Sequence, residues 1–279
     1  MAPSLRTCRD LLPTHNHISC RVLLALLAGL CMNSVHGADK PARRQITLRD
    51  GWLVKQLDTN KGDVAELARE SATPDKTWLP TRMPAQVHDV LLAHGVIPDP
   101  HIGKNAAASA WVGEKDWAYV CRFPTPENIH SQVFLRFEGL DTLADAWLNG
   151  APLGHFENMF REYAGEVKDH LAPAGKSNVL VIVFSSPLRY TRAAELPPGD
   201  PAAAPHKSLR KCHSDFSSYL GARPHAVKVG VYRDVVLDLP EQSWIQDVWV
   251  RSTLSPNRRA ATLHVRVKTG GDQAAIHWL

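Results

Sequence analysis

Residues 133–150 read VFLRFEGLDTLADAWLNG, and this stretch contains two strand patterns followed by a turn. Apolar residues alternate with other residues along both parts, at Val133, Leu135 and Phe137 and again at Ala144, Ala146 and Leu148. A period of two is typical of strands with one buried face. Asn149-Gly150 follows directly, and this dipeptide is the strongest short hairpin signal because both residues tolerate positive φ. The stretch therefore predicts two strands and a tight hairpin.

Further strands are expected on both sides of this stretch. The run 178–184, NVLVIVF, is continuously apolar and rich in β-branched residues, as expected for a strand covered on both faces. Later strands are predicted at Val231–Leu239, Trp244–Val250 and Ala261–Lys268. Many short strands with Gly/Pro turns indicate an all-β fold, a β-sandwich or jelly roll.

One short helix interrupts the strand pattern. Residues 84–95 place Pro84 at the start and Gly95 just past the end, and the buried stripe is expected at Val87, Val90, Leu91 and His94. His88 and His94 are six residues apart, so they project from different faces and cannot form a metal pair. No Cys-x-x-Cys or Cys/His cluster is present either, and we expect neither metal nor cofactor.

The organisation of the chain follows from its connections. Residues 185–229 join two strong strands without clear periodicity and contain a Pro/Ala-rich part, and loops of this length are often functional. Disorder of residues 193–206 is the competing interpretation. A domain boundary is expected at Pro240–Ser243, which divides a sandwich over residues 45–240 from the start of a second sandwich over 244–279.

The N-terminus has the features of an export signal. A basic stretch ends at Arg21, the apolar run Val22–Leu30 follows, and Val35-His-Gly37 offers small residues for cleavage before Ala38. The run is shorter than the roughly 20 residues that span a bilayer, so no membrane anchor is expected. A short buried helix is the alternative. Residues 1–37 are thus predicted to be a signal peptide of a periplasmic or secreted protein.

Composition excludes some classes of function. The net charge is only +4, and no dense run of Lys and Arg marks a nucleic-acid surface. Of the five cysteines, only Cys121 and Cys212 lie beyond the leader. They are expected either to form one disulfide or to remain two buried thiols.

Several motifs, in order, resemble the N-terminal region of β-mannosidases in glycoside hydrolase family two. They span roughly residues 45–250, and the matching segments are Met83–Pro100, Trp111–Tyr119, Phe137–Gly150, Asn158–Arg161 and Gly230–Val235. The resemblance implies a galactose-binding-like jelly roll, then an immunoglobulin-like sandwich, then a (β/α)₈ catalytic barrel. Such enzymes retain anomeric configuration with two glutamates roughly 5 Å apart. A barrel takes about 250 residues, so we expect this chain to be non-catalytic alone.

The resemblance also suggests sugar-binding residues. In this family a jelly-roll loop before the Gly230 motif reaches the active-site pocket, and here it corresponds to Lys211–Pro224. The family's Trp-Asp-Trp-Gly sequence is absent from that loop, which puts mannose specificity in doubt. Asp215, Tyr219 and Arg223 remain candidates to supply a carboxylate, an aromatic face and a cation, and a solvated loop is the alternative.

Aromatic residues elsewhere give one further candidate. Trp111, Trp117 and Trp147 can form a sugar-stacking platform or serve the core, where tryptophan is common. We expect structural roles for Trp117 and Trp147 and retain Trp111 as a substrate-binding candidate.

Acidic residues are not expected to form an independent hydrolytic site, because each candidate lies in a turn or beside a strand: Glu114, Glu138, Asp141, Asp145 and Glu157. The favoured function is therefore the non-catalytic N-terminal portion of a β-mannosidase-like glycosidase, whose partners are a glycan and a C-terminal catalytic barrel. The alternative is a stand-alone exported carbohydrate-binding module.

Overall fold

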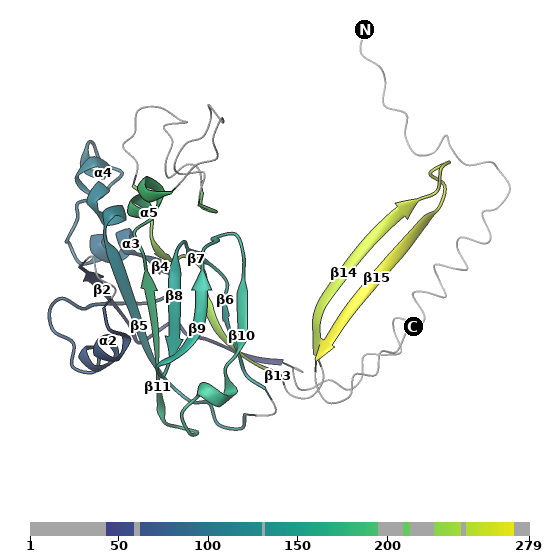
Figure 1. Ribbon diagram of the computed structural model, residues 1–279, viewed down its shortest axis with the longest axis horizontal. Helices are drawn as coiled ribbons and strands as arrows, with labels where there is room; N and C mark the ends of the chain where they lie inside the picture. Colours follow the sequence, from purple (N-terminus) through teal and green to yellow (C-terminus); the bar gives the residue numbers. More distant parts are fainter. Residues whose placement is uncertain are drawn as a thin grey trace, which may run out of the picture. The chain divides into compact units, whose positions relative to one another are not determined.

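The computed structural model describes residues 43–58, 62–129, 132–194, 209–212, 226–240 and 244–270, which are mostly β-strands in antiparallel sheets (Figure 1). One sheet has the order β1–β13–β6–β10: β1 (Arg43–Thr47), β13 (Val235–Pro240), β6 (Phe134–Phe137) and β10 (Tyr163–Glu166). A second sheet has the order β3–β2–β5–β11–β8–β9: β3 (Leu79–Thr81), β2 (Trp52–Leu57), β5 (Asp116–Pro124), β11 (Ser177–Phe184), β8 (Ala144–Leu148) and β9 (Ala151–Phe156). The prediction of an all-β fold is confirmed.

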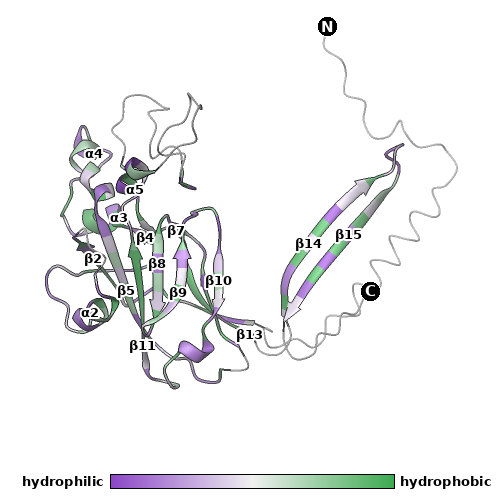
Figure 2. Ribbon diagram, viewed as in Figure 1, coloured by the Kyte–Doolittle hydropathy of each residue, from purple (hydrophilic) through white to green (hydrophobic). Residues whose placement is uncertain are grey.

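Strand β11 lies inside the six-stranded sheet, between β5 and β8. Its side chains alternate between two hydrophobic clusters. Leu180, Ile182 and Phe184 belong to the main core, whereas Val181 and Val183 pack on the opposite face. The prediction of a strand covered on both faces is confirmed, and Figure 2 shows β11 as hydrophobic over most of its length.

The β8–β9 hairpin turns at Asn149 and Gly150, whose φ angles are +52° and +86°. Two consecutive positive φ values define the type I′ turn, whose twist matches that of the flanking strands. The Asn149 side chain also fastens the turn to β11, because its Oδ1 accepts from Val179 N at 2.8 Å. The predicted hairpin is confirmed.

The expected helix is α3 (Val87–Ala93), and it begins three residues after Pro84. Residues 85–86 instead form the short strand β4 (Ala85–Gln86), which pairs with β12 (Gly230–Val231). Val87, Val90 and Leu91 are buried as predicted, but the expectation for His94 was wrong. The His94 ring is exposed, with its Nε2 2.8 Å from Pro80 O.

Other short helices were not predicted from sequence. They are α2 (Val64–Glu70), α4 (Asn105–Ala108), α5 (Pro187–Ala193) and the 3₁₀ segments η1 (Ala110–Glu114) and η2 (Lys168–His170). None is longer than seven residues, so none contains enough turns to produce a clear 3.6-residue period. Helix α2 buries Leu67 against the outer cluster of the six-stranded sheet.

The predicted strand Val231–Leu239 is divided in two. Val231 belongs to β12, which lies between β4 and β7 (Leu140–Asp141). The part from Val235 onward belongs to β13. A continuous strand is not possible because the two parts pair with different sheets. Residues 232–234 connect them.

The two last predicted strands form a hairpin of their own, β14 (Trp244–Leu254) and β15 (Ala261–Gly270). Along both strands hydrophobic and polar residues alternate (Figure 2). Val248 and Val250 pair with Val267 and Val265, so these apolar side chains share one face. Val248 and Val250 are 50% and 56% exposed.

Cys121 and Cys212 do not form a disulfide. Cys121 is a buried free thiol on β5, and its Sγ lies 3.6 Å from Asp50 O. Burial, with a smaller contribution from the Asp50 carboxylate, raises the pKa of the Cys121 thiol to about 12. The thiol therefore stays protonated at neutral pH and behaves as a core residue.

Candidate functional site

The structure describes one of the four candidate residues expected from sequence. Asp215, Tyr219 and Arg223 lie outside the described residues. Trp111 lies on η1, is partly buried, and packs on the core with its ring centroid 6.0 Å from that of Trp117. Its substrate-binding role remains a prediction.

The other two tryptophans are placed as structural residues. Trp117 is 1% exposed, and its Nε1 donates to Val112 O at 3.0 Å. Trp147 is partly buried and packs against the cluster outside the six-stranded sheet. The sequence-based expectation for both is confirmed.

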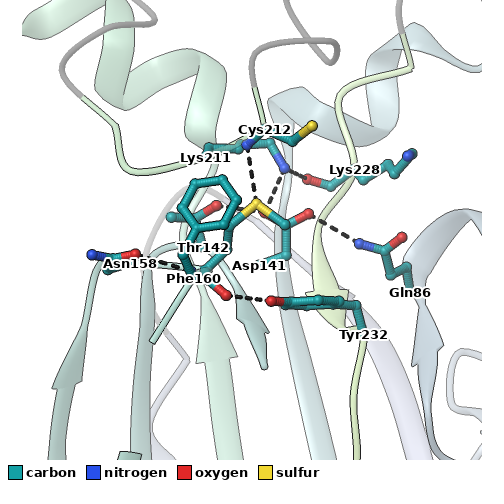
Figure 3. Close-up of polar contacts among 10 residues, drawn as sticks. Gln86, Asp141, Thr142, Asn158, Phe160, Lys211, Cys212, Lys228 and Tyr232 are labelled. Atoms are coloured by element: carbon teal, nitrogen blue, oxygen red, sulfur yellow. Dashed lines mark hydrogen bonds and ion pairs between the residues drawn. The ribbon is translucent and has the colours of Figure 1, made fainter. Parts of the chain in front are cut away.

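Segments 209–212 and 226–229, which flank the expected sugar loop, are held together by a buried ion pair. Lys211 Nζ lies 2.5 Å from Asp141 Oδ1, and the two side chains are 0% and 1% exposed. The same ammonium group donates to Lys228 O at 2.8 Å, which ties one flank to the other. Figure 3 shows Lys211 reaching Asp141 and the Lys228 carbonyl together. Lys211 thereby connects the two described flanks with strand β7.

Asp141 is a centre of polar contacts as well as an ion-pair partner. Gln86 Nε2 donates to its Oδ2 at 3.0 Å, and Thr142 Oγ1 donates to its Oδ1 at 2.5 Å. A buried charge pair is tolerated only when hydrogen bonds satisfy its remaining polar atoms, because both ions lose their hydration. The contacts of Asp141 meet this condition, and they connect β7 to the residue before helix α3.

The turn at residues 158–161 is attached to the same flank. Met159 N donates to Arg210 O at 3.0 Å, and Cys212 N donates to Met159 Sδ at 3.0 Å. The Tyr232 hydroxyl donates to Met159 O. Phe160 N donates to Asn158 Oδ1 at 2.9 Å within the turn. Figure 3 shows Phe160 beside these contacts. The Phe160 side chain is 67% exposed.

Helix α5, which precedes the long segment 195–208, is also fixed by charge. Its Arg189 forms an ion pair with the buried Asp116 at 2.5 Å, and Asp116 Oδ1 also accepts from Ser186 N at 2.7 Å. Arg192 donates through two nitrogens to Glu114. The contacts join α5 to η1 and to the start of β5.

The acidic residues considered for catalysis mostly have cationic partners in the described structure. Glu114 pairs with Arg192, Glu138 with Arg136, Asp141 with Lys211 and Asp145 with His155, whereas Glu157 is exposed. Glycoside hydrolysis needs one carboxyl group that donates a proton and one that attacks or activates water. Carboxylates held by Arg or Lys are suited to structural roles.

The described residues contain neither a cluster of metal-ligating side chains nor a helix that could span a membrane. No group of three or more His, Cys, Asp or Glu side chains lies close enough to hold a metal ion. No helix in that part of the chain combines the length and the apolar character that a bilayer crossing requires.

Sequence reasoning missed the Asp141–Lys211 pair. The sequence indicates Asp141 only as a candidate acid and Lys211 only as the first residue of the expected loop. The partners are 70 residues apart, and neither motif contains a local pattern that indicates its partner. Asp141 lies inside one of the family-like motifs, whereas Lys211 lies in the loop from which the family's Trp-Asp-Trp-Gly sequence is absent, so no shared motif links the two residues.

The chain is similar to known proteins over most of its length. Residues 52–233 match the family model described as "Glycosyl hydrolase 2 galactose-binding domain-like". "Beta-mannosidase B" of Thermothelomyces thermophilus is 33% identical, with 71% of this chain and 23% of the relative covered. The corresponding protein of Aspergillus niger is 31% identical, with coverages of 78% and 25%. The chain thus spans about a quarter of the length of these relatives.

The chain is also similar to parts of solved glycosidase structures. The β-D-mannosidase from Dictyoglomus thermophilum superposes with a TM-score of 0.63 at 26% identity, covering 81% of this chain and 26% of that one. A β-glucuronidase from an uncultured Clostridium species has a TM-score of 0.51 at 18% identity, with coverages of 85% and 35%. The second likeness shows a shared fold.

Proposed function

Because the chain belongs to the glycosyl hydrolase 2 family of galactose-binding-like domains, we propose that it is the non-catalytic, carbohydrate-facing N-terminal portion of a β-mannosidase-like glycosidase. The observation that carries this proposal is the family match over residues 52–233, together with relatives named as β-mannosidases. The substrate class would be β-linked mannosides or related glycans.

The non-catalytic assignment is supported by the contacts of the acids. The acids Glu114, Glu138, Asp141 and Asp145 each pair with a cationic side chain or a histidine. Retaining hydrolysis requires two carboxyl groups roughly 5 Å apart, one on each side of the scissile bond. We assign that chemistry to a separate catalytic barrel of about 250 residues.

We further propose that residues 244–279 begin a second, immunoglobulin-like sandwich, with the boundary at Pro240–Ser243. The hairpin β14–β15 has one face of apolar side chains, including Val248, Val250 and Val265, that are 44% to 56% exposed. An apolar sheet face is stable when another layer covers it. The leader-like sequence of residues 1–37 supports export to the periplasm or the medium.

A titration of the purified chain tests carbohydrate binding. Mannose, glucosamine and manno-oligosaccharides are added while tryptophan fluorescence and heat of binding are followed. We expect a saturable signal with at least one manno-oligosaccharide, and a flat response to all of them would refute the carbohydrate-facing role.

An activity assay with an aryl β-mannoside tests the non-catalytic assignment. We expect no turnover by the chain alone, with a full-length β-mannosidase as positive control. Hydrolysis that persists through purification would refute the assignment. Sequencing downstream of codon 279 separates the two remaining possibilities, since a barrel of suitable length supports the enzyme portion and its absence supports a stand-alone binding module.

A further inference from the structure

Phe160 is the most exposed of the large apolar side chains in the described part of the chain, at 67%. A single exposed apolar residue needs no functional explanation in itself, because folded surfaces contain many of them. Phe160 differs from an ordinary surface residue in how firmly its backbone is held.

The turn that carries Phe160 is fixed on the N-terminal side of this residue. Met159 precedes Phe160 and makes three hydrogen bonds. Its N–H donates to the Arg210 carbonyl, its own carbonyl accepts from the Tyr232 hydroxyl, and its sulfur accepts from the Cys212 N–H. The Phe160 N–H is itself bonded to Asn158 Oδ1. The ring is therefore presented to solvent from a position with little backbone freedom, and such pre-organisation lowers the entropic cost of binding.

The anchor of this turn is the segment that leads into the expected sugar loop. Asn158 pairs with Arg210 in an isolated bridge, and the next residue, Lys211, forms the buried pair with Asp141. The exposed residues Arg161 and Arg210 add cationic hydrogen-bond donors to the same two segments. An exposed aromatic ring in a polar, donor-rich setting suits a saccharide, whose C–H face packs on the ring and whose hydroxyl groups bond to the surrounding donors.

We propose that Phe160 is a sugar-stacking residue of this chain, positioned by the Met159 contacts and by the Asp141–Lys211 pair. The ligand class is a pyranoside of a β-linked glycan, and the inference rests on the proposed carbohydrate-facing function. The competing occupant, an apolar side chain of a protein partner, predicts no effect of Phe160 on sugar binding.

Three variants of the full chain test this inference by calorimetric titration with the manno-oligosaccharide that the unaltered chain binds best. Phe160→Ala should weaken binding roughly three- to tenfold, the range expected for loss of one aromatic contact. Phe160→Tyr keeps the ring and should stay within about twofold of the unaltered chain. Ile102→Ala removes another apolar side chain, 62% exposed, and should have no effect.

Each outcome bears on a different claim. Equal binding by Phe160→Ala and the unaltered chain would overturn the stacking role and leave the proposed function intact. Equal weakening by Phe160→Ala and Phe160→Tyr would also overturn it, since a ring is retained in the second variant. Absence of binding by the unaltered chain would overturn both. Thermal unfolding followed by circular dichroism verifies that all variants fold, which is expected because both substituted side chains are exposed.

Discussion

Replacing Lys211 with methionine removes the cation of the buried pair and keeps a side chain of similar length. In the unaltered chain the Lys211 ammonium group lies 2.5 Å from Asp141, and the substitution would leave this buried carboxylate without it. Removing one partner of a buried pair typically costs about 3–5 kcal/mol, because the remaining charge is desolvated and uncompensated. Gln86 and Thr142 still donate to Asp141, so we expect the lower end, about 3 kcal/mol.

Urea unfolding followed by tryptophan fluorescence measures this loss. A matched control is Lys55→Met, because Lys55 forms an ion pair of similar length, 2.6 Å, with Glu70. The Lys55 and Glu70 side chains are 23% and 38% exposed, so water screens that pair. Its loss should cost less than about 1 kcal/mol.

A double-mutant cycle assigns the effect to the pair. Asp141→Asn alone leaves a buried ammonium group, whereas Asp141→Asn with Lys211→Met removes both charges. The double variant should therefore lose about 2 kcal/mol less than the sum of the two single variants. Additive losses, or a Lys211→Met loss as small as that of Lys55→Met, would refute the argument that this pair is buried and mutually dependent.

Three further perturbations test local features. Gly230→Ala should lower the free energy of unfolding, measured in urea, by roughly 2–3 kcal/mol, because φ is +129° and the new methyl group would meet the Tyr119 hydroxyl. Adding Tyr119→Phe should recover part of this loss, and full additivity of the two substitutions would contradict the contact. Gly150→Ala should lower the free energy of unfolding by about 1 kcal/mol, because the residue has a φ of +86°. Gly165 has open space around it and no positive φ, so Gly165→Ala should be neutral. Equal shifts in Tm for the two variants would contradict the turn assignment. Burial raises the pKa of the Cys121 thiol from about 9 to about 12, so stability should fall by roughly 1 kcal/mol per pH unit above pH 9; Cys121→Ala should lose this contribution while keeping that of the buried Tyr119 hydroxyl, whose pKa is also raised, and curves parallel to that of the unaltered chain would contradict burial of the thiol.

Much of the sandwich could be predicted from local sequence. The alternation in β6 and β8, the continuous apolar run of β11 and the Asn149-Gly150 turn each depend on residues within one short segment. A strand with one buried face must alternate, and a type I′ turn must have two positive φ values. These constraints act over a few residues, and so the linear sequence reveals them.

The candidate site was less predictable because its contacts are long-range. Nothing in the segment around Lys211 indicates that its ammonium group is buried against Asp141, 70 residues away. The exposure of Phe160 has the same origin, since an apolar residue in a turn is buried or exposed according to what the rest of the chain places beside it. The division of Val231–Leu239 into β12 and β13 also depends on strand partners from distant segments.

The sequence alone thus determined the fold class, the hairpin and the family, because period, turn chemistry and ordered motifs are local properties of the chain. Tertiary structure decided which charges pair in the interior, where the strand after Gly230 breaks, and which aromatic ring reaches solvent. These features depend on the balance between desolvation and pairing, and that balance exists only after segments far apart in the chain have been brought into contact.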